Sequence, residues 1–457
     1  MQDLASWLSY IEGLHPKSIA MGLDRVRLMI ARLQLDPQFP IITVAGTNGK
    51  GSTCAMLEQI YLQAGYHVAC YTSPHLLRYN ERVRVNGIEV NDADLCAAFS
   101  AVDAARLGHD QVISLTYFEV GTLAAMWHFV QTGVEIAILE VGLGGRLDAV
   151  NAFEPSCAVV TSVDLDHQDF LGDTRESIGY EKAGVYRPAI AAICGDANPP
   201  ASLVAQAHEI QADFMTMHRD FDYLMHADGW QYKANEQIRY TLPLPALAGQ
   251  YQLNNAACAI AAVESLQARL PVAQAAIKNA MQLVRLAGRF QTVAGLYSPR
   301  VILDVAHNPH AARALAANLG EIKMQSSSAV TAKTFAVFAM LADKDIKGVI
   351  DALKHEVDAW YVADIYHARG ARAIDLAKLI NSAIADVSVK VFTSADDAYQ
   401  QACIDIQACV QGNENDKIVV FGSFFTVSTV MQFLSNQSCE RKLGIEKSIF
   451  KESSNAP

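Results

Sequence analysis

A glycine-rich segment with one lysine and several hydroxyls is the first feature of the sequence that indicates a definite chemistry. It reads Ala45-Gly-Thr-Asn-Gly-Lys-Gly-Ser-Thr53 and joins an apolar, strand-like run to a segment with helical patterning. In this context, backbone N–H groups and the helix N-terminus converge on an anion, and the lysine adds positive charge. The segment departs from the G-x-x-x-x-G-K-[ST] pattern, because Val44 replaces the first glycine and Gly51 separates Lys50 from Ser52. We predict a variant phosphate loop that binds ATP, in preference to a glycine turn without a ligand.

Two further runs end in ionisable side chains that are candidates for holding a cation beside those phosphates. Glu140 ends a strand-like run before Gly142-Leu-Gly-Gly-Arg146, and another such run ends in Asp164-Leu-Asp-His167. Ligands of open α/β sheets bind at the carboxyl ends of the strands. A buried Glu140 carboxylate either pairs with Arg146 or Lys50 or holds a cation, and magnesium is the better interpretation. His167 is either a core histidine or a ligand at the same edge, and the pattern does not decide between them.

Two helical segments carry charges for which a structural interpretation is the default. Glu181 and Lys182 lie on a predicted helix that Gly184 caps, and a charged, solvated face explains them. Thr116-Tyr-Phe-Glu119 has the spacing of a capping box at the head of an apolar helix. A role in substrate binding for either segment needs support from outside these patterns.

The spacing of apolar runs predicts the elements that position these residues. From residue 41 onward, short β-branched runs alternate with helical segments, which is typical of a parallel sheet covered by helices. Predicted strands lie at 41–45, 68–71, 135–141, 157–163 and 189–194, and Asn86-Gly87 and Asp228-Gly229 each predict a hairpin. A second series at 300–304, 334–340, 360–364, 387–392 and 417–422 predicts a second doubly wound domain. We therefore predict an α/β protein with an N-terminal P-loop domain (1–292), a hinge (293–299), a smaller Rossmann-like domain (300–435) and a polar tail (436–457).

Composition and charge exclude several classes of function. The 457 residues are 51% hydrophobic and 18% charged, which is ordinary for folded globular domains. A formal net charge of -12 argues against general binding to nucleic acid or to anionic membranes. The nine cysteines include no C-x-x-C pair, and neither a signal peptide nor a membrane-spanning apolar run is present. We expect a cytoplasmic protein with free thiols.

Several motifs, taken together, resemble the folylpolyglutamate synthase family of the Mur-ligase superfamily, whose bacterial members are also dihydrofolate synthases. In chain order they are residues 45–52, Tyr71-Thr-Ser-Pro-His75, Leu139-Glu-Val-Gly-Leu-Gly-Gly-Arg-Leu-Asp148, Asp166-His167, Glu181-Lys-Ala-Gly184, Gly288-Arg-Phe290 and Asp304-Val-Ala-His-Asn-Pro309. The resemblance covers nearly the whole chain. It implies a Mur-ligase-type ATPase domain, a C-terminal glutamate-ligase domain, and an active site in the cleft between them.

The resemblance also implies roles for particular residues. The implied ATP-binding residues are Thr47, Asn48, Gly49, Lys50, Gly51, Ser52, Asn255, Arg289 and Asp304. Ser73 and Glu140 are implied ligands of one magnesium ion, and Glu140 and His167 are implied ligands of a second, which a carbamylated Lys182 supports. With Lys50, the residues Glu140, His167 and Lys182 form the implied catalytic group. The implied pteroate-binding residues are Gly13, Leu14, His15, Pro16, Thr116, Tyr117, Phe118, Glu119, Leu147, Asp148 and Ala149.

The implied reaction is the ATP-dependent formation of an amide. A substrate carboxylate takes the γ-phosphoryl group of ATP, and the amino group of L-glutamate attacks the resulting acyl phosphate. The implied acceptors are dihydropteroate, which becomes dihydrofolate, and reduced folates, which gain further glutamates. We expect a monomer without nucleic-acid or membrane partners. Phe425 stands where close bacterial relatives have histidine, and we expect it to pack in the core.

Three competing interpretations fit the sequence less well. A P-loop kinase or GTPase would keep Ser or Thr directly after Lys50. A non-catalytic, ATP-gated module has no reason to place Glu140, His167 and Lys182 at successive positions of a sheet edge. A Mur-type cell-wall ligase shares the fold, and the substrate-binding segments alone argue against it.

Overall fold

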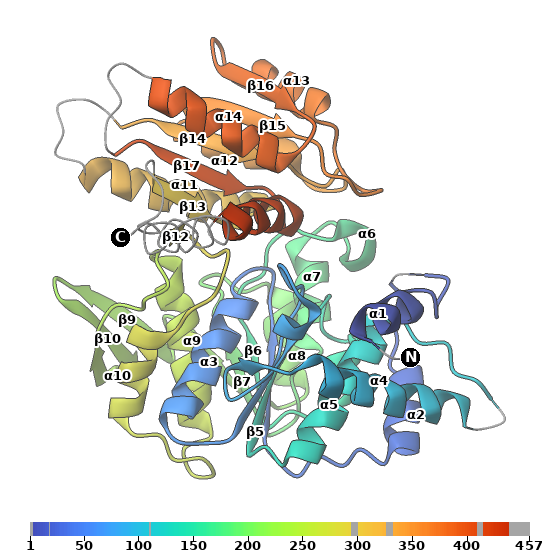
Figure 1. Cartoon of the computed structure of the whole chain (residues 1–457). Coiled ribbons are helices and arrows are strands. Elements are labelled where there is room, and N and C mark those ends of the chain that lie inside the picture. The colour runs from blue at the N-terminus through green and yellow to red at the C-terminus, as the bar shows by residue number, and fades with distance from the viewer. Residues whose placement is uncertain are drawn as a thin grey trace, which may run out of the picture. The chain divides into compact units, whose positions relative to one another are not determined.

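The chain forms two units, each built around a mainly parallel sheet (Figure 1). The computed structural model describes residues 3–17, 19–108, 111–293, 300–325, 332–408 and 415–437. The first unit is Met1–Leu286 and the second is Ala287–Pro457. Apart from Val293, the predicted hinge lies outside the described residues, as do residues 438–457 of the predicted tail. Residues 436 and 437 end a helix that runs over 424–437.

An eight-stranded sheet forms the centre of the first unit, in the order β4-β3-β2-β5-β1-β6-β7-β8. The strands are β1 (Ile41–Ala45), β2 (Val68–Tyr71), β3 (Val83–Val85), β4 (Ile88–Glu89), β5 (Ile136–Glu140), β6 (Cys157–Val160), β7 (Ala191–Cys194) and β8 (Asp213–Thr216). Neighbours from β2 to β8 pair in parallel, whereas β3 and β4 add an antiparallel hairpin to β2. This hairpin turns at Asn86 and Gly87, whose φ angles of 54° and 73° are the left-handed pair that an Asn-Gly turn requires.

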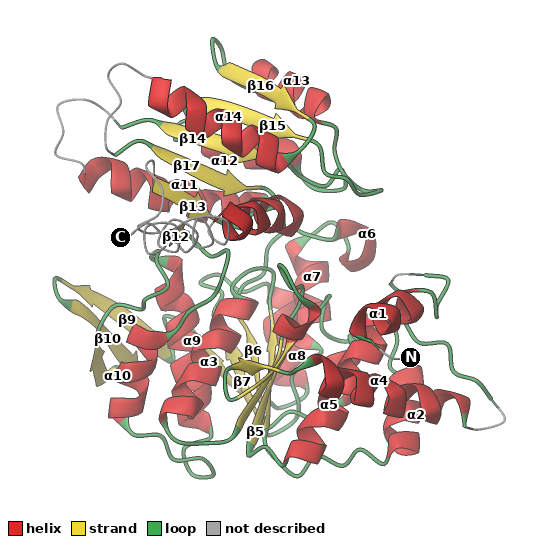
Figure 2. Ribbon diagram, in the orientation of Figure 1, coloured by secondary structure: helices red, strands yellow, loops and turns green. Residues whose placement is uncertain are grey.

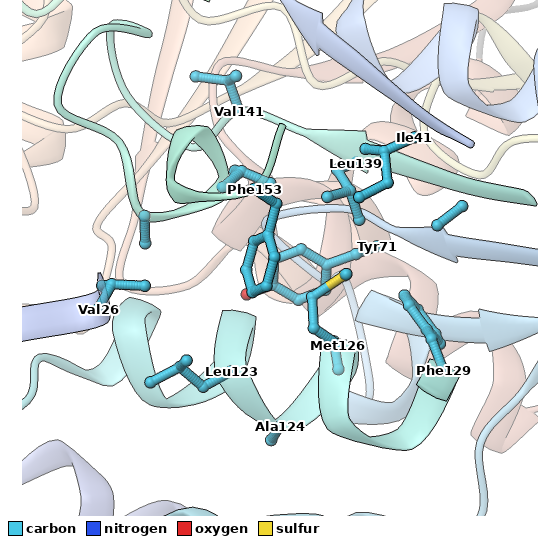
Figure 3. Close-up of a cluster of buried hydrophobic side chains, with 14 of the residues drawn as sticks. Val26, Ile41, Tyr71, Leu123, Ala124, Met126, Phe129, Leu139, Val141 and Phe153 are labelled. Carbon is cyan, nitrogen blue, oxygen red and sulfur yellow. The ribbon is translucent and has the colours of Figure 1, made fainter. Parts of the chain in front are cut away.

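Helices cover both faces of this sheet, so alternating strand residues enter two different cores. On β1, Ile41 and Ala45 lie in one core, and Ile42 and Val44 lie in the other. Figure 3 shows part of the first core, with Tyr71 packed beside α5. Its helices are α1 (Leu4–Glu12), α2 (Asp24–Leu33), α4 (Asp92–Leu107), α5 (Tyr117–Thr132), α7 (Arg175–Ala183) and α8 (Ala201–Glu209). The second core is covered by α3 (Lys50–Gln63), α9 (Tyr251–Ser265) and α10 (Gln274–Leu283).

Shorter elements complete the first unit. An antiparallel sheet of β9 (Phe221–His226), β10 (Gly229–Ala234) and β11 (Gln237–Leu242) contains the hairpin predicted around Asp228 and Gly229. Buried Trp230 and Tyr232 of β10 pack into the second core. The remaining elements are the short helix α6 (Gln168–Leu171) and the 3-10 turns η1 (Tyr79–Arg82) and η2 (Ala149–Ala152).

The second unit contains a six-stranded sheet in the order β12-β13-β17-β14-β15-β16 (Figure 2). Its elements are β12 (Gln291–Val293), β13 (Arg300–Leu303), α11 (Pro309–Gln325), β14 (Thr334–Phe338), α12 (Ile346–Leu353), β15 (Ala359–Ala363), α13 (Ala373–Ala383), β16 (Ser388–Phe392), α14 (Ala395–Ala408) and β17 (Lys417–Phe421). The pair β12–β13 is antiparallel and the other pairs are parallel, which confirms the predicted fold class. Through β12, residues 291–293 belong to this sheet, although the sequence places the domain boundary after residue 292. A strand of three residues is too short to produce a recognisable alternating pattern.

Candidate active site

Two glycines shape the phosphate loop that joins β1 to α3. Gly46 has a φ of 147° and Gly49, which precedes α3, has a φ of 87°, and both values favour glycine. A Cβ atom at Gly46 would also lie 1.9 Å from Thr161 Oγ1. The Lys50 ammonium donates to the carbonyl oxygens of Gly46 at 2.9 Å and Thr47 at 3.3 Å, so its charge lies over the loop. The loop thus has the fold and the charge that a phosphate group requires.

Residues that follow β6 hold this loop in place. Thr47 Oγ1 donates to the carbonyl of Asp164 and accepts from its N–H, both at 3.0 Å. The Asn48 N–H donates to Ser162 Oγ at 3.1 Å, and Thr161 Oγ1 donates to the Asn48 carbonyl at 2.6 Å. Thr161 and Ser162 are not among the site residues predicted from the sequence; the available signal was a pair of hydroxyls near the carboxyl end of the predicted strand 157–163.

Asn255 of α9 lies against the same loop, although it is far away in the sequence. A Cβ atom at Gly49 would come within 2.3 Å of Asn255 Oδ1, so the amide packs directly on this glycine. Asn255 Nδ2 donates to Gln252 Oε1 at 2.9 Å, which orients the amide. Gly51 and Ser52 are buried in the first turn of α3. The six loop residues and Asn255 are therefore together in the first unit.

Glu140 and Ser73 meet at the carboxyl ends of the neighbouring strands β5 and β2. The Ser73 N–H donates to Glu140 Oε2 at 2.9 Å, and Glu140 is buried with 4% exposure. Arg146, one of the two cations considered as a partner for Glu140, donates to Glu181 Oε1 at 2.8 Å. A buried carboxylate beside a phosphate loop fits a magnesium site, because Mg²⁺ takes few protein ligands and completes its shell with phosphate oxygens and water. The described residues contain no group of three or more His, Cys, Asp or Glu side chains that could hold a metal ion by themselves.

His167 and Lys182 lie at the same edge of the sheet. The His167 side chain is 36% exposed and its Nε2 lies 4.0 Å from Asp166 Oδ1, so it is not a core histidine. Lys182 is buried on α7, with 3% exposure. Burial is the largest cause that lowers the pKa of Lys182 from 10.5 to about 7; the positive charge of Lys50 lowers it too, whereas Asp166 and Asp148 oppose the shift. The default interpretation of Lys182 as part of a solvated face is therefore wrong.

A cavity of about 240 Å³ opens beside these residues within the first unit. Ser73 and His167 contribute to its wall. Of the implied pteroate-binding residues, its wall contains Thr116, Phe118, Glu119, Leu147, Asp148 and Ala149. The wall also contains residues that were not predicted from the sequence, namely Ile19, Ala20, Met21, Gly22, Pro74, Arg82, Gly142 and Leu143. Tyr117 lies outside this lining and packs edge-on against Tyr79.

The segment 19–22, and not the predicted segment 13–16, forms the N-terminal part of the wall. Arg25 fixes it, because Arg25 Nη2 donates both to the Ala20 carbonyl at 2.7 Å and to Glu119 Oε1 at 2.8 Å. Glu119 also completes the predicted capping box by accepting from the Thr116 N–H at 2.8 Å. Segment 13–16 lies next to residue 114, whose hydroxyl donates to the Leu14 carbonyl. Residues 13–16 were implied by the resemblance alone, and no motif quoted from the sequence includes residues 19–22.

Asp148 organises the glycine-rich turn after β5. Its Oδ2 accepts from the N–H groups of Gly142 at 3.1 Å and Leu143 at 2.9 Å, and its Oδ1 accepts from Val150 at 3.0 Å. Burial raises the pKa of Asp148 to about 7, although these N–H groups oppose the shift. A Cβ atom at Gly142 would collide with the Phe118 ring at 2.7 Å, so the turn and the ring pack closely in the cavity wall.

Arg289 and Asp304, two of the implied ATP-binding residues, lie in the second unit. Asp304 follows β13 and is buried, and its carboxylate accepts from the N–H groups of Phe290 and Ala306, each at 2.8 Å. The Arg289 guanidinium lies 5.4 Å from the centre of the Phe424 ring. The expectation that Phe425 packs in the core is wrong, because this side chain is 43% exposed. It follows the sheet at the start of the helix 424–437, where its ring packs against His367.

The comparisons with known proteins agree with this arrangement of two units. Residues 44–263 match the Mur ligase middle domain, and residues 288–424 match the glutamate ligase domain of Mur ligases. The dihydrofolate synthase/folylpolyglutamate synthase of Escherichia coli (strain K12) is 43% identical over 432 residues, which are 94% of this chain and 95% of that protein. Among the described residues, no helix is long and apolar enough to cross a membrane.

Two solved structures are similar over nearly the whole chain. E. coli FolC in complex with DHPP and ADP is 43% identical, with a TM-score of 0.86, and the match covers 96% of this chain and 99% of that one. A bifunctional folylpolyglutamate synthase/dihydrofolate synthase with Mn, AMPPNP and L-glutamate bound is 41% identical, with a TM-score of 0.83 and coverage of 95% and 98%.

Proposed function

Because this chain belongs to the dihydrofolate synthase/folylpolyglutamate synthase family of Mur ligases, we propose that it uses ATP to join L-glutamate to dihydropteroate and to reduced folates. The first reaction gives dihydrofolate and the second lengthens the glutamate tail. One observation carries the proposal: the cavity of about 240 Å³ has Ser73 and His167 in its wall, at the strand ends that also carry the phosphate loop. An acceptor in this cavity therefore presents its carboxylate toward the nucleotide.

The reaction proceeds through an acyl phosphate. One carboxylate oxygen of the acceptor attacks the γ-phosphorus of ATP, the bond from this phosphorus to the bridging oxygen breaks, and ADP leaves. The neutral amino group of L-glutamate then attacks the acyl carbon, phosphate leaves, and the nitrogen loses a proton. Lys50 and the N–H groups of the loop hold the phosphates in position. Holding three substrates in one orientation supplies much of the rate.

The proposed cation sites use the residues at the ends of β2 and β5 and the residue that precedes α6. Ser73 and Glu140 would hold one Mg²⁺, and Glu140 and His167 would hold the second. Their support is the buried Glu140 carboxylate, the 2.9 Å hydrogen bond that places Ser73 beside it, and the position of His167 in the same cavity wall. When bound, the cations neutralise the charge that moves between the phosphates and the acceptor.

We propose that the side chain of Lys182 is carbamylated. Its neutral Nζ would attack the carbon of CO₂ and lose a proton, which replaces an ammonium by an anionic carbamate. A pKa of about 7 leaves a large neutral fraction at physiological pH, and this supports the assignment. A carbamate would also turn the repulsion between Lys182 and Lys50 into attraction and would support the second cation.

The proposed acceptor site consists of residues in the cavity wall. It retains Thr116, Phe118, Glu119, Leu147, Asp148 and Ala149, and it replaces Gly13, Leu14, His15 and Pro16 by Ile19, Ala20, Met21 and Gly22. In the second unit, Arg289 and Asp304 remain proposed nucleotide-binding residues. We also propose that the chain is a monomer and that it is cytoplasmic; the location alone is supported by the free thiols of the described cysteines, which suit a reducing compartment.

A product analysis tests the proposed function. The purified chain is incubated with MgATP and L-glutamate, and either dihydropteroate or a tetrahydrofolate is offered as the acceptor. We expect dihydrofolate from the first mixture and a longer polyglutamate from the second, each identified by mass. Product from the tetrahydrofolate alone would make the chain a monofunctional polyglutamate synthase, and product from neither acceptor would contradict the proposal.

A further inference from the structure

Arg82 lines the cavity and has no role in the assignments above. It ends the turn η1, and its carbonyl accepts from the Thr72 N–H at 2.9 Å. This bond places Arg82 next to the segment that carries Ser73 and Pro74, which share the cavity wall with it. Arg82 therefore shares this part of the wall with Ser73, whose N–H donates to Glu140 Oε2 at 2.9 Å.

Within the described part of the chain, the Arg82 guanidinium has no carboxylate partner. Its Nε donates to His75 Nδ1 at 2.8 Å, and its carbon lies 5.4 Å from the centre of the Tyr79 ring and 5.5 Å from that of Tyr117. The two terminal nitrogens form no hydrogen bond with the described residues. Their N–H groups are therefore available to a ligand in the cavity.

The groups around Arg82 hold it in place without neutralising it. His75 Nδ1 is the acceptor of the hydrogen bond from Arg82 Nε, and the imidazole carries no negative charge. Tyr79 and Tyr117 offer ring faces, which attract a cation but carry no net charge. Arg82 consequently keeps its full positive charge in a fixed orientation, as a site for an anion requires.

The carboxylates of the cavity wall do not compete for this cation. Glu119 pairs with Arg25 at 2.8 Å. Asp148 accepts from three backbone N–H groups, those of Gly142, Leu143 and Val150. Both acidic groups are thus already hydrogen-bonded, and neither lies within ion-pair distance of Arg82.

From this geometry we infer that Arg82 binds the acceptor carboxylate that becomes phosphorylated and holds it beside the phosphates of ATP. This inference rests on the proposed function, because Arg82 would bind the acceptor substrate of that reaction. Dihydropteroate presents an aminobenzoyl carboxylate and a reduced folate presents a glutamate side-chain carboxylate. Both are planar and match the two parallel N–H donors of a guanidinium. After the phosphoryl transfer, the same cation lies beside the negative charge of the acyl phosphate.

Binding of two matched ligands tests this inference. The first ligand is dihydropteroate, and the second is the same molecule with hydrogen in place of the carboxyl group. Their dissociation constants are measured by calorimetry with the full chain and its variants Arg82→Gln and Arg82→Lys. Arg269→Gln is the control, because Arg269 donates to the Gln38 carbonyl at 3.2 Å and does not line the cavity.

We expect Arg82→Gln to weaken the binding of dihydropteroate by about 10- to 100-fold and to leave the binding of the decarboxylated ligand nearly unchanged. Arg82→Lys keeps the positive charge but lacks the two parallel N–H donors of the guanidinium, so it should recover part of the lost affinity for dihydropteroate. Equal weakening of both ligands would mean that Arg82 only supports the shape of the wall, and this would overturn the inference, as would unchanged binding of both. If the wild-type chain binds neither ligand and forms no product, the proposed function fails as well, so the two failures are distinguishable.

Discussion

At the scale of single residues, the charge of Lys50 is the feature on which phosphoryl transfer depends most directly. Its ammonium donates to two loop carbonyls and is thereby held over the phosphate loop. We expect Lys50→Ala to lower the rate of ligation by at least about 100-fold, because a preorganised charge is lost where negative charge moves. The thermal unfolding midpoint should stay close to that of the wild type, since Lys50 makes no ion pair with the described residues. Near-normal turnover in this variant would contradict the assignment of the loop to ATP.

The proposed role of Lys182, the support of a cation, requires that this residue carry a negative charge. We expect Lys182→Ala to be inactive and to regain part of its activity when a small carboxylate such as acetate is added, because the acetate can take the place of a carbamate. Lys50→Ala under the same conditions is the control and should not respond to acetate. Mass analysis that finds an unmodified Lys182 in a fully active preparation would refute the carbamate.

The burial of Lys182 also predicts how the free energy of unfolding depends on pH. Its pKa is about 7 in the folded chain and 10.5 when exposed, so between these values the unfolded state binds more protons. Stability relative to Lys182→Met should therefore rise with pH, by roughly 2–3 kcal/mol between about pH 7 and pH 9, and should be constant below pH 7. Urea titrations without metal or CO₂ measure this difference. The variant Lys378→Met, at an exposed lysine, is the control. If the difference in the free energy of unfolding between the wild type and Lys182→Met does not change with pH, folding does not lower the pKa of Lys182, and the prediction is contradicted.

At the scale of elements, the turn between β1 and α3 depends on a glycine that has two separate functions. Gly49 has a φ of 87°, and its missing side chain also leaves room for Asn255. Gly65 also has a left-handed backbone, with a φ of 90°, but no atom lies within 4 Å of the position that its Cβ would take. Gly65 therefore shares the backbone conformation of Gly49 without the close contact. Gly49→Ala and Gly65→Ala should each lower the free energy of unfolding by about 1–2 kcal/mol, because both force alanine into the left-handed region.

The two alanine variants should differ in nucleotide binding. We expect the KM for ATP to rise by at least about tenfold in Gly49→Ala, since the new Cβ displaces Asn255 and moves the loop N–H groups. In Gly65→Ala the KM for ATP should be unchanged. Equal KM values in the two variants would show that the contact between Gly49 and Asn255 is not part of the nucleotide site.

At the scale of the whole molecule, the size of the cavity constrains how the chain treats two acceptors. A volume of about 240 Å³ is below the roughly 300 Å³ at which pockets for drug-sized ligands begin. We therefore expect the cavity to take one acceptor at a time, each with the carboxylate that becomes phosphorylated at Arg82. We expect dihydropteroate and a reduced folate to compete, so that each inhibits the ligation of the other with an inhibition constant close to its own KM. Non-competitive inhibition would indicate two separate acceptor sites.

Features that a few neighbouring residues encode could be predicted before the fold was known. The phosphate loop follows from glycines that the backbone conformation requires, and the Asn86-Gly87 hairpin follows from two left-handed residues. The positions of Glu140 and His167 follow from the rule that parallel strands present their carboxyl ends at one edge. These signals depend on φ angles and on periodicity within a short segment, so they can be recognised without knowledge of the fold.

The segments that form the cavity, and the environment of their charged groups, depend on the packing of the whole first unit. Segment 19–22 enters the wall because Arg25 joins it to Glu119, and Arg82 lines the cavity while its Nε donates to His75 instead of to a carboxylate. Lys182 has a lowered pKa because the packing of α7 removes it from water. Each of these properties depends on contacts between residues that are distant in the sequence, or on the burial of a charge. No local sequence pattern encodes such contacts or such burial, because both arise only when the whole unit has packed.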